Sequence, residues 1–208
     1  MSLLPDEAFN LELPSGGGCS FALLGSTRSG KSTLLGWILE HHFSKHIGVL
    51  MTCSPQAQVY KGMKEVLQAP KYIPKVIKEM ASINKDCKNH YDFLAVLDDV
   101  VTAKFDKELL KMLTIYRNSN VSCIISLQAL TLMNNNARGN VNFVILMKMN
   151  SDEQIEKIVK AYLNSYFPRG WTLLDKMREY KRLTEDHHFF CVDNLNGRVF
   201  RSKIAIHG

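Results

Sequence analysis

Eight consecutive residues near the start of the chain constrain its fold more than any other feature. From Gly25 to Ser32 they read Gly-Ser-Thr-Arg-Ser-Gly-Lys-Ser, which matches the pattern G-x-x-x-x-G-K-[ST] at every fixed position. A short apolar run at residues 20–24 precedes them, and apolar residues recur at helical spacing over residues 34–39. This order of strand, glycine-rich loop and helix predicts a phosphate-binding loop in an α/β fold.

The loop predicts the residues that would bind a nucleoside triphosphate together with magnesium. Its glycines let the backbone wrap closely around phosphate oxygens, and its N–H groups and the following helix N-terminus attract negative charge. Lys31 is expected to reach the β- and γ-phosphates, and Ser32 is expected to ligate Mg²⁺. With ATP and Mg²⁺ as cofactors, the predicted nucleotide-binding residues are Gly25, Ser26, Thr27, Arg28, Ser29, Gly30, Lys31, Ser32 and Thr33.

A second apolar stretch ends in two carboxylates. Residues 93–97 are apolar throughout and are followed by Asp98 and Asp99. Because open α/β sheets bind ligands at the carboxyl ends of their strands, Asp98 is expected beside the loop as the second magnesium ligand. Asp99 is a candidate to polarise the attacking water; the alternative is that Asp99 only caps or turns the chain.

The next predicted strand also ends in a polar residue. Residues 123–127 form a buried strand in this prediction, and Gln128 follows it. A single glutamine is weak evidence by itself, but here a polar side chain stands directly after the last residue of a predicted buried strand. Gln128 is therefore a candidate to sense the γ-phosphate, and it would act by positioning rather than by proton transfer.

Apolar runs and helical patterns alternate along the rest of the chain. Further strands are predicted at residues 47–52 and 143–147, and a terminal hairpin is predicted between residues 189–192 and 198–200. Residues 55–90 are polar and lysine-rich, and we expect helices and loops there. Strands that are apolar throughout and alternate with helices indicate a mostly parallel sheet covered by helices on both faces.

The length of 208 residues suits a single α/β domain. Residues 1–18 are expected to form an opening strand and turn, because apolar and polar residues alternate over residues 9–13. Residues 19–150 would form the ATPase core, and residues 151–208 would add C-terminal helices and strands. Residues 151–154 match the S-x-x-Q capping box, which predicts the start of one of these helices.

Basic residues gather in three places, and the net charge is +6. Residues 61–88 hold seven lysines against three acidic residues, and residues 169–182 hold five basic residues against two acidic ones. The third group comprises Arg198, Arg201 and Lys203. Such clusters on an ATPase favour a polyanionic partner, because phosphate neutralisation dominates affinity for nucleic acids.

The chain is expected to be soluble and intracellular. No apolar run approaches the ~20 residues that a membrane-spanning helix needs. The first ten residues carry Asp6 and Glu7 and no basic stretch, so they do not resemble a signal peptide.

Together these motifs resemble the FtsK/HerA superfamily of P-loop ATPases that pump DNA. The most similar branch comprises the poxvirus-type genome-packaging ATPases of large DNA viruses, virophages and related mobile elements. The resemblance is carried by residues 25–32, residues 93–99 and the stretch from residue 116 to residue 128. It covers residues 9–150, and beyond them only the order of elements is similar. Many superfamily members carry glutamate at the position of Asp99.

The resemblance implies a RecA-like domain that acts as a homo-oligomeric ring. It implies a motor that translocates double-stranded DNA into a capsid, with capsid or portal-vertex proteins as partners, in a host-cell virus factory or on the virion. It also implies that Arg117, which precedes the strand ending in Gln128, is an arginine finger that reaches the neighbouring subunit's site. Arg138 is the rival candidate for this role.

Two other functions fit a P-loop chain. One is a nucleotide or small-molecule kinase, and the other is a regulatory ATPase that acts on protein. The tandem acids Asp98 and Asp99 favour hydrolysis over phosphoryl transfer. Lysines rather than an arginine-rich lid lie between Lys31 and Asp98, which also disfavours a kinase.

Overall fold

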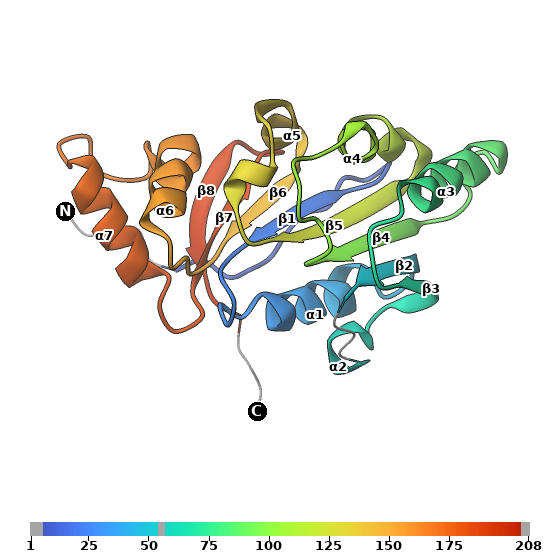
Figure 1. Ribbon diagram of the computed structural model, residues 1–208, viewed down its shortest axis with the longest axis horizontal. Coiled ribbons are helices and arrows are strands. Elements are labelled where there is room, and N and C mark those ends of the chain that lie inside the picture. Colours follow the sequence, from blue (N-terminus) through green and yellow to red (C-terminus); the bar gives the residue numbers. More distant parts are fainter. Residues whose placement is uncertain (1–5, 54–56, 205–208) are drawn as a thin grey trace.

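The described residues, 6–53 and 57–204 of a computed structural model, form one eight-stranded sheet (Figure 1). The strand order is β3-β2-β4-β5-β1-β6-β7-β8. Strands β1 to β6 pair in parallel, whereas β7 is antiparallel to both β6 and β8, so the predicted mostly parallel sheet and C-terminal hairpin are confirmed. The strands are β1 (Ser20–Leu24), β2 (Ile47–Thr52), β3 (Lys64–Ala69), β4 (Phe93–Asp98), β5 (Val121–Leu127), β6 (Phe143–Leu146), β7 (Phe189–Asp193) and β8 (Arg198–Ser202).

Helices cover both faces of the sheet, as predicted (Figure 1). One face carries α1 (Lys31–His42) and α2 (Ala57–Tyr60). The other carries α3 (Pro74–Asp86), α4 (Lys107–Thr114), α5 (Asn135–Asn140), α6 (Asp152–Ile158) and α7 (Leu173–Leu183). Three short helical turns complete the described part of the chain: η1 (Tyr116–Ser119), η2 (Leu130–Leu132) and the π-type turn η3 (Val159–Leu163).

The central strands are apolar throughout because both of their faces are covered. Alternate residues of β1, β4, β5 and β6 point into two separate cores, one under α1 and one under α3 to α7. In the register of the sheet, Leu24 of β1 lies between Leu127 of β5 and Leu146 of β6, and Asp98 of β4 lies beside Ser126 of β5. The carboxyl ends of these four strands therefore meet along one edge of the sheet.

The predicted opening strand is wrong. Residues 9–13 are not in a strand, although Phe9 and Leu11 are buried. The Phe9 ring packs against Trp37 of α1, with ring centroids 5.1 Å apart, and against Phe189 of β7, 4.9 Å apart. The alternating apolar residues thus reflect packing over the α1 face of the sheet and not pairing within it.

Strand β3 lies within residues 55–90, where the sequence predicts only helices and loops. It pairs in parallel with β2 and ends the sheet on that side. Its sequence is half polar, and Val66 and Leu67 are 59% and 43% exposed, as suits a strand at an edge. The missing apolar run explains why periodicity does not reveal it.

None of the helices in residues 6–53 and 57–204 combines the length and the apolar content that a bilayer-spanning helix requires.

Candidate functional site

The glycine-rich loop connects β1 to α1 at the carboxyl edge of the sheet and is anchored to neighbouring segments. The Gly25 N–H donates to the Leu127 carbonyl at the end of β5, 3.2 Å away. The Ser26 N–H donates to the carbonyl of Lys148, just beyond β6, at 3.0 Å, and Ser26 Oγ accepts from the Asn150 N–H at 2.9 Å. Backbone bonds on both sides of β1 therefore fix the start of the loop.

Two glycines of the motif meet steric requirements that other residues do not. A Cβ on Gly25 would lie 2.4 Å from Ser29 Oγ and 3.0 Å from Met147 Cβ. Gly30 has φ of +92°, in the left-handed region, and a Cβ there would lie 3.0 Å from His187 Nδ1. The backbone of the loop is thus closed tightly enough to exclude side chains at both positions.

Lys31 is buried within this loop, with 7% of its surface exposed. Its Nζ donates to the carbonyls of Gly25 at 2.7 Å and Ser26 at 3.3 Å. Burial lowers the pKa of Lys31, and the negative charges of Asp99 and Asp98 partly oppose that effect. A buried ammonium group at a helix N-terminus is suited to neutralising a phosphate.

Asp98 ends β4 and is buried beside the loop, with 8% of its surface exposed. Its carboxylate accepts a 2.6 Å hydrogen bond from the Tyr60 hydroxyl at the end of α2. Burial and this bond to Asp98 raise the pKa of Tyr60, so the phenol stays protonated and keeps donating. Tyr60 holds the carboxylate in place, and no motif in the sequence identifies it.

Asp99 is exposed and turns the chain away from the sheet. Its φ of 54° lies in the left-handed region, which Asp and Asn tolerate better than other residues with a Cβ. Its Oδ1 accepts from Ser126 Oγ of β5 at 3.4 Å. The turn and the predicted catalytic role of Asp99 are therefore compatible, because the turn leaves its carboxylate beside the carboxyl end of β5.

Gln128 directly follows β5 and is exposed. The sheet thus places the loop with Lys31, the two acids and Gln128 at the carboxyl ends of β1, β4 and β5, which lie side by side in the order β4-β5-β1. The placement is the predicted one, and the roles of the individual side chains remain predictions.

Two residues present suitable ligands for Mg²⁺ near this edge. Ser32, in the first turn of α1, offers a hydroxyl, and Asp98 offers a carboxylate. Hard oxygen donors of this kind, completed by phosphate oxygens and water, are what Mg²⁺ prefers. The predicted pair therefore fits the ion.

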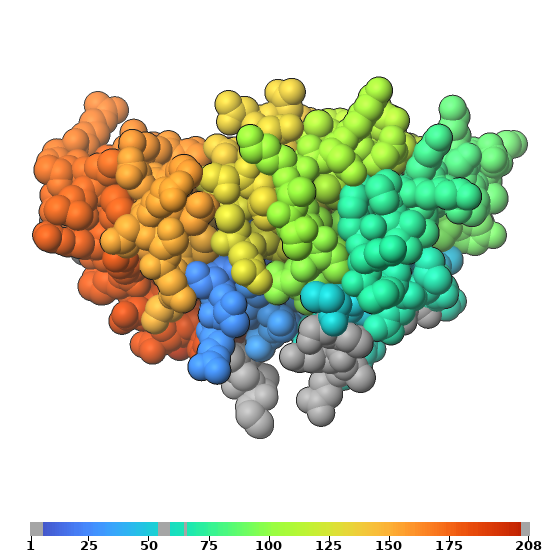
Figure 2. Space-filling model, viewed as in Figure 1, coloured from blue at the N-terminus to red at the C-terminus, as the bar shows by residue number. Residues whose placement is uncertain are grey.

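A basic cleft of about 490 Å³ opens beside the loop. Arg28, Lys148 and Lys203 bring cationic side chains to it, and Asp186 is its acidic residue. Figure 2 shows this side of the molecule, where the blue segment that contains the loop reaches the surface next to the orange and red C-terminal segments. The excess of positive charge suits an anionic ligand.

Arg117 lies at the opposite edge of the sheet, in η1, just before β5 begins. Its Nη1 is 3.3 Å from the Asn140 carbonyl and 3.4 Å from Asn142 Oδ1. The seven residues of β5, about 3.3 Å each, separate it from Gln128. Arg117 therefore does not reach the nucleotide site of its own chain, and a role in a neighbouring subunit's site remains a prediction.

Arg138, the rival candidate, is bound to carbonyls of its own chain. On α5, its Nε donates to the Met133 carbonyl at 3.1 Å and its Nη2 donates to the Leu130 carbonyl at 3.3 Å. These bonds hold its guanidinium against the segment that follows Gln128.

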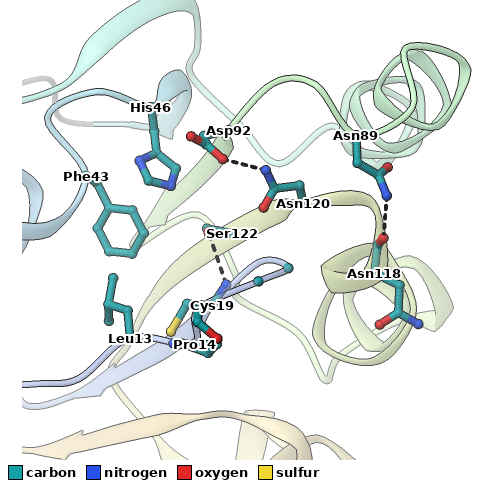
Figure 3. Close-up of a pocket in the computed structure, with 13 residues that line it drawn as sticks. Leu13, Pro14, Cys19, Phe43, His46, Asn89, Asp92, Asn118, Asn120 and Ser122 are labelled. Carbon is teal, nitrogen blue, oxygen red and sulfur yellow. Dashed lines mark hydrogen bonds between the residues drawn. The ribbon is translucent and has the colours of Figure 1, made fainter.

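The amino edge of the sheet carries a separate pocket of about 330 Å³ (Figure 3). His46, Asp92 and three asparagines line part of it, and Asn120 Nδ2 donates to Asp92. None of the predicted site residues lines this pocket. The loop and the paired acids therefore lie at the carboxyl edge, away from this pocket.

Known proteins resemble this chain in structure rather than in sequence. No family model matches the sequence, and no curated protein matches it at a significant level. The genome-packaging NTPase B204 from Sulfolobus turreted icosahedral virus 2, in complex with AMPPCP, is similar with a TM-score of 0.63 at 12% identity. That match covers 90% of this chain and 98% of the viral one.

Two further structures share the fold. The type VII secretion ATPase EccC from Thermomonospora curvata matches with a TM-score of 0.57 at 12% identity over 92% of this chain and 24% of its own cytoplasmic domain. The conjugation coupling protein TcpA of pCW3 matches with a TM-score of 0.58 at 13% identity over 90% of this chain and 60% of its own. B204 is a genome-packaging NTPase, EccC is a secretion ATPase, and the TcpA structure contains ATPγS. The chain therefore has the RecA-like α/β fold of the P-loop ATPases.

Proposed function

We propose that this chain is an ATP-hydrolysing motor that translocates double-stranded DNA and packages a viral genome into a capsid. The observation that carries the proposal is the convergence of the Lys31 loop, after β1, with Asp98 and Asp99, at the end of β4, on either side of β5. The DNA part is supported by the resemblance of the motifs and by a fold shared with a genome-packaging NTPase and a conjugation coupling protein. A ring of identical subunits, capsid or portal-vertex partners and a place in the virus factory or virion belong to the same proposal.

In this proposal each group at the carboxyl edge has one task. The loop N–H groups and Lys31 bind the β- and γ-phosphates, and Ser32 and Asp98 hold magnesium, which neutralises developing phosphate charge. Asp99 polarises the attacking water, and Gln128 positions the γ-phosphate and the water relative to each other. The short bond from Tyr60 keeps the Asp98 carboxylate pointed at the site.

Only some of the basic clusters are available to DNA. Arg201 pairs with Asp6, and Arg198 lies 3.2 Å from Asp193 and 3.4 Å from Glu7. The lysines of the 61–88 cluster are exposed, and Lys75 is the member that pairs with an acidic side chain, Glu79, within the described residues. We therefore place the DNA contact on this cluster, which spans β3 and α3.

Duplex DNA is expected to stimulate ATP hydrolysis, and rising salt is expected to remove the stimulation. Lys78 and Lys85 lie seven residues apart on one face of α3. Changing both to Ala should lower the slope of log affinity against log salt by about 1.8, because each phosphate contact contributes about 0.9. Steady-state ATPase assays and DNA-binding titrations across salt concentrations measure both effects.

The matched control is the double variant Lys157→Ala, Lys160→Ala, whose lysines pair with Glu153 and Glu156. It should leave DNA binding unchanged. A rate of ATP hydrolysis that is unchanged by DNA but raised by a protein would favour the regulatory ATPase. Phosphoryl transfer to a nucleotide or small-molecule acceptor would favour the kinase. A DNA complex that is sequence-selective and insensitive to salt would contradict the translocase.

A trans-acting Arg117 is expected to show complementation in mixed rings. Arg117→Ala and Asp99→Asn should each be inactive alone, since an arginine finger is worth about 10³–10⁵ in rate. In randomly mixed rings about one interface in four joins an intact Asp99 site to an intact Arg117, so a mixture should recover up to that share of activity. ATPase assays on mixed chains test this.

The variants must first be shown to assemble, by size measurement, because Arg117 also contacts Asn140 and Asn142. Inactive Arg117→Ala chains that form rings but never complement Asp99→Asn would reject the trans finger.

A further inference from the structure

The segment after Gln128 is connected to both sides of the site. It forms η2, in which Leu130 is fully buried. The Leu132 carbonyl accepts a 3.0 Å hydrogen bond from the N–H of Phe105, in the loop between Asp99 and α4. Movement of η2 would therefore displace Gln128, which lies two residues before it.

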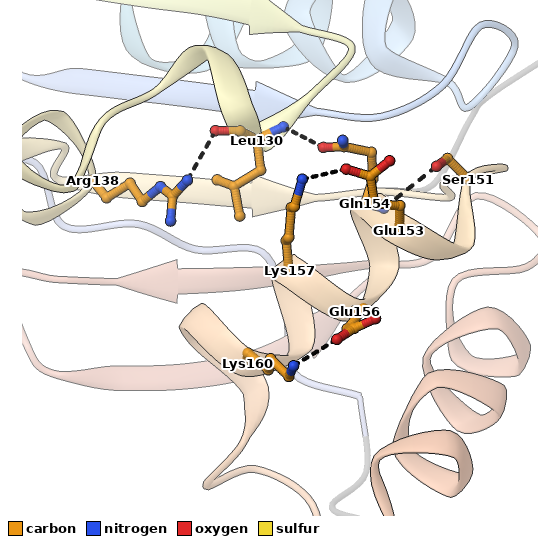
Figure 4. A network of polar contacts seen from close by, with 8 residues as sticks. All are labelled: Leu130, Arg138, Ser151, Glu153, Gln154, Glu156, Lys157 and Lys160. Atoms are coloured by element: carbon orange, nitrogen blue, oxygen red, sulfur yellow. Dashed lines mark hydrogen bonds and ion pairs between the residues drawn. The ribbon is translucent and has the colours of Figure 1, made fainter.

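The peptide groups of Leu130 are held from two helices (Figure 4). The Leu130 N–H donates to Gln154 Oε1 of α6 at 2.9 Å. The Leu130 carbonyl accepts from Arg138 Nη2 of α5 at 3.3 Å, and Arg138 Nε also bonds the Met133 carbonyl. Because Leu130 is buried, the bond from Gln154 satisfies an N–H that is withdrawn from water. The Arg138 bond adds a second donor to a carbonyl that also accepts from the Met133 N–H at 3.0 Å.

Gln154 has a different partner from the one that its local sequence predicts. In the S-x-x-Q capping box its side chain would return to the backbone N–H of Ser151. Ser151 Oγ does accept from the Gln154 N–H at 3.4 Å, but the Gln154 side chain bonds Leu130 instead. The glutamine side chain therefore serves a contact between α6 and η2.

We propose that Gln154 and Arg138 are positioning residues that act through the Leu130 peptide groups to hold Gln128 at the nucleotide site. The proposal rests on the proposed function, because it assigns Gln128 a task in hydrolysis. It gives Arg138 a role within its own chain in place of a finger in a neighbouring site. It also connects α6 to the catalytic edge. Helix α7 is connected in turn, because Lys181 of α7 forms an ion pair with Asp152 of α6.

Gln154→Ala is expected to lower kcat for ATP hydrolysis about tenfold, since one buried hydrogen bond of η2 is lost and Gln128 is displaced. KM for ATP should change little, because the Lys31 loop is untouched. Gln154→Glu keeps the acceptor and should restore most of kcat. Glu153→Ala, on the exposed side of the same helix, is the matched control and should behave as wild type.

The double variant Gln128→Ala, Gln154→Ala separates positioning from a general structural effect. If Gln154 acts through Gln128, the double variant is no slower than Gln128→Ala alone. Losses that multiply, a loss confined to KM, or no rescue by Glu would overturn the proposal. If Gln154→Ala does not fold, Arg138→Lys, which keeps the charge but not the two-pronged contact, replaces it in the same cycle.

The wild-type chain and Lys31→Ala are assayed in the same series. If neither hydrolyses ATP, the proposed function fails, and the positioning of Gln128 fails with it. If the wild type hydrolyses ATP in a Lys31-dependent manner while Gln154→Ala keeps full kcat, only the positioning proposal is rejected.

Discussion

Lys31→Ala is expected to reduce ATP hydrolysis to background while the chain remains folded. The substitution removes a buried cation that would neutralise phosphate charge in the transition state, and losing one such group costs roughly 10²–10³-fold or more in kcat. Its Nζ donates to two carbonyls of the loop itself, so the thermal unfolding temperature should change little. Steady-state hydrolysis and a thermal melt measure the two quantities.

Lys45→Ala is the matched control. Lys45 is an exposed lysine just beyond the far end of α1, and its substitution makes the same change in net charge. It should hydrolyse ATP as the wild type does. Unchanged turnover in Lys31→Ala would reject the nucleotide site itself, whereas a melt that collapses would mean that Lys31 mainly stabilises the loop.

Asp99→Asn is expected to stop hydrolysis while ATP still binds. Asparagine has the same size as aspartate and tolerates the left-handed φ of 54° at this position, so the turn is kept. What is lost is the negative charge that we propose polarises the water, and a fall in kcat of about 10²–10⁴ is the usual effect of losing a general base. A nucleotide-binding titration beside a single-turnover assay separates the two steps.

Asp98→Asn should behave differently, because it should weaken the proposed magnesium shell and therefore binding as well as catalysis. Asp86→Asn, at the exposed end of α3, is the neutral control. Normal turnover in Asp99→Asn would show that another group orients the water. Glutamate at this position would reach further, but it would also meet the cost of the left-handed conformation that aspartate tolerates.

The parts of the site that follow from the sequence are those encoded within a few residues. The loop is contiguous in the sequence. Local crowding requires glycine at Gly25, and a positive φ favours glycine at Gly30. The placement of Asp98 follows from one further step, because a parallel sheet aligns the carboxyl ends of its strands. The predicted α/β class and terminal hairpin depend on the same apolar runs.

The parts that do not follow depend on contacts between distant segments. Tyr60 donates a hydrogen bond to Asp98 from a four-residue helix that carries no recognisable motif. The Gln154 side chain accepts from the Leu130 N–H, 24 residues away, and not from the capping position that its local sequence predicts. Residues 9–13 show the reverse case, since a two-residue alternation arises there from packing across a helix face. The periodicity of apolar residues indicates that one side of a segment is buried, but it does not indicate which element packs against that side.

The exposed strand β3 has a consequence for handling the chain in concentrated solution. Among the described residues, none pairs with its outer edge, and Val66 and Leu67 are exposed along it. Such an edge is a template for strand pairing between copies, and the charges of Lys64, which begins the strand, and of Lys61, just before it, oppose that pairing by repulsion. Salt screens this repulsion over about 10 Å at 0.1 M. High salt should therefore promote precipitation through β3 under the same conditions that are expected to weaken DNA binding, which sets an upper limit on useful salt concentrations.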